Sequence, residues 1–130
     1  MPRMNRFSRA LVLLFVTAST VPAFAEDTSP PKLNCQAGPL HRSYAKGEWL
    51  LYACDDGRSL VAVTDKGNPA MPFYFMFYVR PDGEMTLHGE GEGDKAATQA
   101  AFDELKTLTQ DDVAALVRDA NAAGEKRGSE

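Results

Sequence analysis

Apolar and polar side chains alternate along residues 73–88 (FYFMFYVRPDGEMTLH), which is the pattern of a half-buried pair of β-strands. Arg80-Pro81-Asp82-Gly83 separates the two strands. Its proline stands where a type I turn prefers proline, and its glycine stands where a following bulge needs a positive φ. The resulting three-residue loop predicts a register that pairs Arg80 with Glu84, Val79 with Met85, Tyr78 with Thr86, Phe77 with Leu87, and Met76 with His88.

This register sorts the side chains of the hairpin by chemistry, because successive residues of a strand point to opposite faces of the sheet. The inner face is apolar and consists of Phe73, Phe75, Phe77, Val79, Met85 and Leu87. The outer face combines aromatic, thioether, hydroxyl and charged groups, from Tyr74, Met76, Tyr78, Arg80, Glu84, Thr86 and His88. We predict that the first set is core and that the second set forms an amphipathic surface.

A second hairpin is predicted earlier in the chain, at residues 49–64. Its two segments, WLLYAC and SLVAVT, have the length and composition of strands. Asp56-Gly57 between them is typical of a two-residue turn in which both central residues take a positive φ. This turn pairs Cys54 with Ser59, Tyr52 with Val61, and Leu50 with Val63. Both faces of the hairpin are largely apolar, so we expect cover on both sides.

The hydrophobic period changes to that of helices after Gly93. Asp94 is a candidate N-cap, and Thr109-Gln110-Asp111-Asp112 is similar to a capping box with Asp in place of Glu. Gly124 is a typical end for the second helix. The apolar stripes of the two helices are Ala97, Ala101, Leu105 and Leu108, and then Val113, Leu116, Val117 and Ala120. The fold class is therefore α+β, with an antiparallel sheet of about four strands in two hairpins followed by a C-terminal helical hairpin packed on one face.

The first 25 residues have the features of a signal peptide. Basic residues precede an apolar run (ALVLLFVT) that is shorter than the roughly 20 residues needed to span a bilayer, and Ala23-Phe24-Ala25 fits the rule for cleavage. We expect residues 1–25 to be removed and residues 26–47 to form an N-terminal coil tethered by a disulfide, with a short strand near 40–44. Residues 48–123 are then a single α+β domain, and residues 124–130 are a flexible tail.

Cysteine use and charge both indicate an exported protein. Cys35 and Cys54 are the two cysteines of the chain, and their spacing does not fit a Cys-x-x-Cys redox or metal motif, so we predict a structural disulfide. Without residues 1–25, 11 Lys and Arg stand against 18 Asp and Glu, a net charge of −7. This balance argues against nucleic acid and anionic membranes as partners. We expect a periplasmic or secreted protein without a membrane anchor after signal cleavage.

No motif in the sequence predicts catalysis or a cofactor. His41 and His88 are the two histidines, and no metal-ligand spacing brings further ligands to them. The acidic segment at residues 89–94 (GEGEGD) is similar to the start of a calcium loop, but Lys95 stands where that loop needs glycine. We interpret the segment as a flexible linker and expect no catalytic residue, no metal and no cofactor. A small metal-dependent hydrolase that uses His88, Glu84 and the acidic linker stays open as an alternative.

The outer face of the hairpin at residues 73–88 is the candidate binding surface, and its members are Tyr74, Met76, Tyr78, Arg80, Glu84 and His88. Tyrosine and methionine suit adaptable protein contacts, since their side chains are large and either partly polar or flexible. We therefore expect a non-catalytic binding or accessory protein whose partner is a periplasmic or extracellular protein. In the alternative interpretation, the C-terminal helices pack on this face and bury it.

Tyr52-Ala53-Cys54-Asp55-Asp56-Gly57 resembles the Tyr-x-Cys-x-x-Gly hairpin of the periplasmic C-type lysozyme inhibitors. Those inhibitors are small exported β-barrels that block the cleft of a host lysozyme. The resemblance covers residues 52–61 and implies lysozyme inhibition as an alternative function. It carries over no inhibitory residue, because the family's later Ser-Gly loop motif is missing here.

Overall fold

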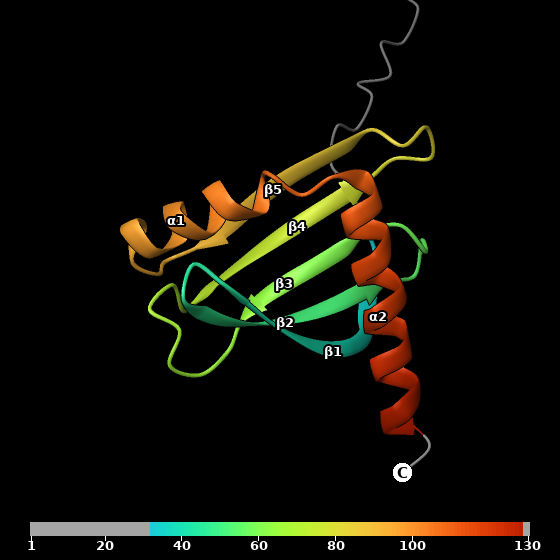
Figure 1. The fold of residues 1–130 in the computed structure, drawn as a ribbon, viewed down its shortest axis with the longest axis horizontal. Helices are drawn as coiled ribbons and strands as arrows, with labels where there is room; N and C mark the ends of the chain where they lie inside the picture. The colour runs from blue at the N-terminus through green and yellow to red at the C-terminus, as the bar shows by residue number, and fades with distance from the viewer. Residues whose placement is uncertain (1–31, 129–130) are drawn as a thin grey trace, which may run out of the picture.

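The computed structural model describes residues 32–128, which form one antiparallel sheet and two helices (Figure 1). Each strand pairs with the next along the chain, so the sheet order is β1-β2-β3-β4-β5 and the sheet is open. The elements are β1 (Cys35–Tyr44), β2 (Gly47–Cys54), β3 (Leu60–Thr64), β4 (Phe73–Val79), β5 (Met85–Gly91), α1 (Lys95–Leu105) and α2 (Gln110–Gly128). The predicted α+β class is confirmed, with five strands instead of about four.

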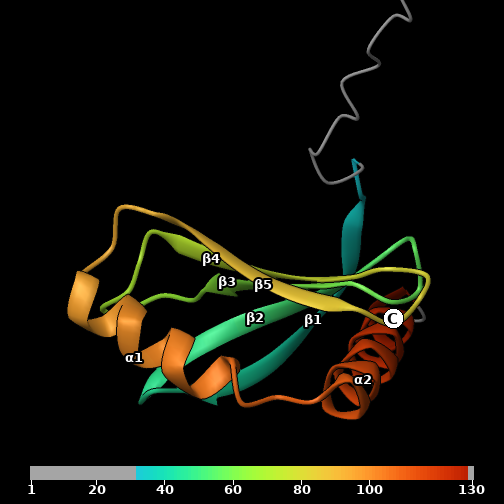
Figure 2. The same cartoon turned by 90° about the horizontal axis from the view of Figure 1, so that it is seen from above.

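Both helices lie on the same side of the sheet, as the two views show (Figures 1 and 2). The sheet side of the core is formed by alternate residues of the three central strands, namely Trp49, Leu51, Ala53, Leu60, Ala62, Phe75 and Phe77. The helices contribute Ala101, Leu105, Val113, Val117 and Ala120. Phe75 lies at the centre, with its ring 5.4 Å from that of Trp49 and 6.4 Å from that of Phe102 in α1. Burial of this aromatic cluster is the main source of cohesion between the layers.

The hairpin of β4 and β5 has the predicted register at every pair, from Val79 with Met85 to Met76 with His88. The turn also has the predicted geometry: the Arg80 amide donates to the Glu84 carbonyl at 2.8 Å, and Gly83 has a φ of 90°. Local turn chemistry is therefore sufficient to set which side chains of this hairpin face the helices.

The hairpin of β2 and β3 also has the predicted pairs, but its turn is different. Only Gly57 takes a positive φ, at 71°, and Asp56 does not. Instead of adopting the left-handed conformation, Asp56 turns its carboxylate back onto the chain and accepts hydrogen bonds from the amides of Arg58 and Ser59 at 2.9 and 2.8 Å. An Asp side chain that bonds its own backbone in this way is a common substitute for a tight turn.

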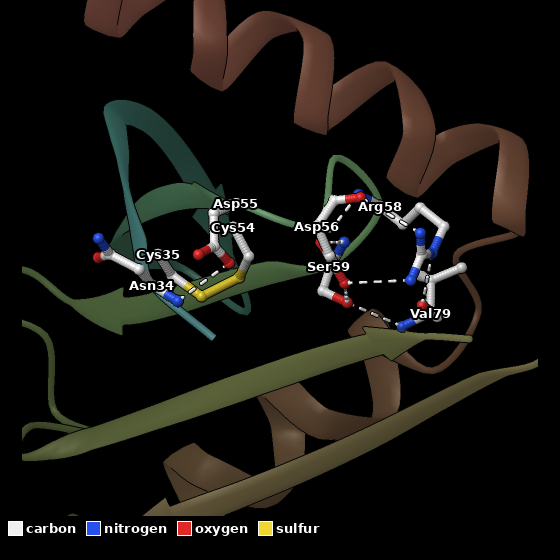
Figure 3. Close-up of polar contacts among 8 residues, drawn as sticks. All are labelled: Asn34, Cys35, Cys54, Asp55, Asp56, Arg58, Ser59 and Val79. Carbon is white, nitrogen blue, oxygen red and sulfur yellow. Dashed lines mark hydrogen bonds and ion pairs between the residues drawn. A yellow bond between two sulfur atoms is a disulfide. The ribbon is translucent and has the colours of Figure 1, made fainter. Parts of the chain in front are cut away.

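This carboxylate belongs to a network that joins the β2–β3 turn to the end of β4 (Figure 3). The Ser59 hydroxyl is buried; it donates to Asp56 Oδ2 at 2.6 Å and accepts from the Val79 amide at 3.0 Å. Arg58 Nε donates to the Val79 carbonyl at 3.1 Å. Burial raises the pKa of Asp56, but the bonds from Ser59 and Arg58 and the nearby guanidinium outweigh burial, so the pKa lies below its usual 3.8.

The predicted disulfide between Cys35 and Cys54 is present and joins β1 to β2 (Figure 3). Asn34 and Asp55 lie beside it and exchange two hydrogen bonds, one between their main chains and one to the Asp55 carboxylate. The prediction of a coil over residues 26–47 with a short strand near 40–44 is wrong from Cys35 onward, because β1 spans Cys35–Tyr44 and β2 begins at Gly47; residues 26–31 lie outside the described residues. The pairing of β1 with β2 shifts register twice, between Cys35 and Ala37 and between Ala37 and Leu40, and these irregularities remove the alternation that marks a strand in sequence.

The helix caps are those predicted. The Asp94 carboxylate accepts from the Ala97 amide at 2.9 Å, and Thr109 and Asp112 exchange reciprocal side-chain-to-amide bonds at 3.1 and 2.9 Å. The predicted end at Gly124 is wrong, because α2 continues to Gly128. A Cβ on Gly124 would lie 3.0 Å from the Gly38 amide nitrogen, so the glycine allows α2 to approach β1 closely.

Residues 89–94 do not form the flexible linker that the sequence suggested. Gly89 and Gly91 belong to β5. A Cβ on Gly89 would lie 2.7 Å from the rings of Phe73 and Phe75, and a Cβ on Gly93 would lie 1.7 Å from the Ala70 carbonyl oxygen. Positions 89 and 93 require glycine, because the Cβ of any other residue would overlap these neighbouring atoms.

Candidate functional site

The side of the sheet opposite the helices carries the residues predicted to form the outer face. Strand pairing places Leu50, Val63, Tyr74 and Glu90 in one row across it, with His41 at the β1 end. A second row contains Tyr52, Val61, Met76 and His88, and Tyr78 pairs with Thr86 beyond it. We call this surface the open face, because neither α1 nor α2 packs on it (Figure 2).

The open face is amphipathic and partly exposed. Its apolar centre from β2 and β3 is half-buried, and Tyr74 is 38% exposed, while Phe75 and Phe77 on the helix side are each 1% exposed. The expectation that the β2–β3 hairpin is covered on both sides is wrong for the described part of the chain. The interpretation in which the helices bury the tyrosines is also wrong, since they pack on the phenylalanine side.

A shallow groove of about 490 Å³ crosses β4 and β5 on the open face. Its lining residues are Tyr74, Met76, Tyr78, Arg80, Thr86, His88 and Glu90. Five of the six residues predicted as a binding surface therefore line one hollow. Glu84 does not; its carboxylate lies 3.2 Å from the Arg80 guanidinium at the hairpin end, and both side chains are more than half exposed.

Glu90 organises the polar end of this groove. Its carboxylate accepts a hydrogen bond from the Tyr74 hydroxyl at 2.9 Å and lies 3.2 Å from His88 Nε2. The contact with His88, followed by the bond from Tyr74, lowers the pKa of Glu90 below its usual 4.5. The same hydrogen bond raises the pKa of Tyr74 above 10.0, because ionisation of the phenol would place two negative charges together.

His88 and Glu90 form an exposed pair at this end of the groove. Their side chains are each more than 60% exposed, so water solvates both groups and weakens the attraction between them. Ser59, the hydroxyl that lies beside a carboxylate, is 0% exposed and already both donates and accepts. Among residues 32–128, no group of three or more His, Cys, Asp or Glu side chains is placed to hold a metal ion.

Sequence reasoning missed one member of the site, because Glu90 was assigned to the linker. The signal was present: the register set by Arg80 and Glu84, continued along β4, pairs Tyr74 with Glu90. His41, the other histidine, lies at the far end of the row, with Nδ1 4.0 Å from an Asp65 carboxylate oxygen. The structure therefore does not bring the two histidines together.

The setting of the protein is indicated by the disulfide, which is typical of an oxidising compartment outside the cytoplasm. No helix within residues 32–128 is long and apolar enough to cross a membrane. The predicted signal peptide, residues 1–25, lies outside the described residues. No family model, curated protein or solved structure matches this chain.

Proposed function

We propose that this chain is a small exported, non-catalytic binding protein that captures a partner protein on its open face. One observation carries the proposal: α1 and α2 both pack on the Phe75 side, so within residues 32–128 no helix covers the Tyr74 side, which is hollowed. An exposed apolar patch rimmed by polar groups is typical of a protein-interaction surface.

The composition of the groove supports a protein partner. Two tyrosines and Met76 give a large contact area with adaptable shape, and tyrosine is enriched at interface centres. Arg80 and Glu90 lie at opposite ends and carry opposite charges, so they favour one orientation of the bound surface. A groove of this shallow form is better suited to a protuberance of a folded protein than to a small molecule, which is normally enclosed.

The test is affinity capture with a variant in which both tyrosines are removed, Tyr74→Ala/Tyr78→Ala. Immobilised wild-type protein should retain a discrete partner from an extract of the cells that produce it, and the double variant should lose it. Met71→Ala is the matched control, because Met71 is 51% exposed and does not line the groove. Met71→Ala should capture as wild type does. Equal capture by the double variant, or a collapse of its melting temperature, would refute the proposal.

A C-type lysozyme is the first purified protein to test as the partner. The hairpin that resembles the lysozyme inhibitors contributes Tyr52 to the open face, where it pairs with Val61 and lies in the row of Met76. Inhibition of cell-wall lysis that is lost in Tyr74→Ala/Tyr78→Ala would identify lysozyme as the partner. Undiminished lysis would exclude lysozyme as the partner, and the capture experiment would still test the open face for another partner.

A further inference from the structure

The outer edge of β5 has unpaired backbone groups. The Arg80 amide bonds the Glu84 carbonyl and the Glu92 amide bonds the Pro72 carbonyl, so the even-numbered residues of β5 point their N–H and C=O groups toward β4. Met85, Leu87 and Gly89 must therefore point theirs away from the sheet. Within the described part of the chain, no hydrogen bond from another element reaches these groups. An edge of this kind is a template for one more strand.

The two edges of the sheet differ in how they are protected. β1 contains Pro39 and two register shifts, which bend and interrupt its edge. β5 pairs with β4 without a shift over seven residues, and its sequence, MTLHGEG, has neither proline nor lysine. Natural proteins usually interrupt a regular edge with a bulge or a proline to prevent pairing. β5 has no such interruption, so its backbone groups keep the regular spacing that an added strand needs.

A cavity on the helix side of β5 offers a place for a side chain of an added strand. It measures about 360 Å³ and lies between β5 and α1, with Leu87, Gly89, Phe75, Thr98, Gln99 and Phe102 in its wall. A strand paired with β5 points alternate side chains to the two faces of the sheet. The residue opposite Leu87 would therefore lie over this hollow, between Leu87 and the side chains of α1.

The negative charge on the open-face side of β5 favours a partner segment with basic side chains. Glu84, Glu90 and Glu92 lie on or beside β5, and the segment from 84 to 92 contains no lysine or arginine. Two copies joined through β5 would bring these carboxylates together along one edge, which disfavours self-pairing. An incoming segment with basic side chains on the open-face side would instead meet opposite charge.

We propose that the β5 edge binds an extended segment of another protein as a sixth strand, with basic side chains beside Glu84 and Glu90 and apolar side chains toward α1. The hydrogen bonds of this interaction use backbone groups that play no part in the open face, and Glu90 is the residue that the two surfaces share. Failure of the backbone test below would therefore leave the proposed function standing.

The probe is the synthetic peptide Lys-Val-Lys-Phe-Lys-Val-Lys. Its lysines alternate with apolar residues, and its phenylalanine is placed to lie opposite Leu87. Antiparallel addition directs the N–H groups of the apolar residues toward β5 and those of the lysines away from it. N-methylation of the apolar residues should therefore weaken peptide binding by at least about tenfold, which corresponds to the loss of about one net hydrogen bond or more. N-methylation of the lysines should leave peptide binding unchanged. Amide exchange at Met85, Leu87 and Gly89 should slow only with the binding peptides.

A variant pair tests the same edge from the protein side. Leu87→Pro removes the outward N–H and leaves the ladder with β4 intact, while Leu87→Ala loses the same side chain and keeps the N–H. Both variants lose the Leu87 side chain from the hollow, so the comparison isolates the N–H, and peptide binding should be at least about tenfold weaker in Leu87→Pro than in Leu87→Ala. Equal binding of the two N-methylated peptides would show attraction by charge alone and would overturn the proposal, even if Leu87→Pro fails to fold. Protection of β5 by self-association without peptide would overturn the assignment to another protein.

Discussion

Replacement of Ser59 by alanine tests whether the network at the β2–β3 turn holds this part of the sheet together. The hydroxyl donates to the Asp56 carboxylate at 2.6 Å and accepts from the Val79 amide at 3.0 Å, and the residue is 0% exposed. A hydrogen bond to a charged group contributes about 1.5–3 kcal/mol, and an unsatisfied buried N–H costs about 1–3 kcal/mol. The two terms overlap, so we expect Ser59→Ala to lower the free energy of unfolding by about 3 kcal/mol.

Urea unfolding followed by far-ultraviolet circular dichroism measures this loss. With a slope of about 1.5 kcal/mol per molar urea, the midpoint should fall by about 2 M. Ser43→Ala is the matched control, because Ser43 is exposed on β1, and its replacement should change stability by less than about 0.5 kcal/mol. A Ser59→Ala variant as stable as Ser43→Ala would refute the role assigned to the network.

The same variant has a defined pH dependence. The pKa of Asp56 in the folded protein lies below 3.8, so the stability that its ionised form contributes is complete above about pH 4 and is lost as pH falls through the folded pKa. Loss of the Ser59 hydroxyl removes one cause of the lowered pKa. The stability difference between wild type and Ser59→Ala should therefore narrow as pH falls below 3.8. A difference that is constant from pH 6 to pH 3 would show that Asp56 keeps its pKa without Ser59.

Three further predictions concern the core, the disulfide and a close backbone approach. Phe75→Ala should cost about 3–5 kcal/mol in urea unfolding because it empties the aromatic centre of the core, and a cost near that of an exposed residue would mean that the two faces are assigned wrongly. Reduction of the Cys35–Cys54 disulfide, which closes a separation of 19 residues, should lower stability by about 3 kcal/mol, and an unchanged melting curve in reductant would contradict this. Gly93→Ala should lower the melting temperature, since its Cβ would meet the Ala70 carbonyl oxygen, whereas Gly128→Ala meets nothing and should not.

The sequence was sufficient for those parts of the fold that local chemistry determines. The loop at residues 81–83 set the whole register of β4 and β5, and the capping groups Asp94 and Thr109 marked where the helices begin. β1 was recognised only in part, because its stability comes from pairing with β2 and from α2 across it, and its register shifts hide the period of a strand. Gly124 was predicted to end the helix, because a glycine there is typical of a helix end. The structure shows that glycine is needed at this position because the backbone of Gly38 lies close to it, and such a tertiary contact is not visible in the sequence.

The candidate site follows the same division. The alternation in β4 predicted that Tyr74, Met76 and Tyr78 share a face, and the structure places them along one groove. Which face the helices cover could not be predicted, since both faces of β2 and β3 are apolar in sequence. Glu90 was not predicted as part of the site, because the glycines on either side of it indicated a flexible linker. In the structure these glycines lie against Phe73 and Phe75, and Glu90 accepts a hydrogen bond from Tyr74.

The most direct test of the central claim, that the open face is the binding surface, is site-specific photo-crosslinking in the cells that produce the protein. A photo-crosslinking amino acid in place of Tyr74 should yield a discrete covalent complex with one partner protein, because Tyr74 lines the groove. The same group in place of Met71, which is exposed but outside the groove, should yield none. No complex from the Tyr74 position, or the same complex from both positions, would contradict the account.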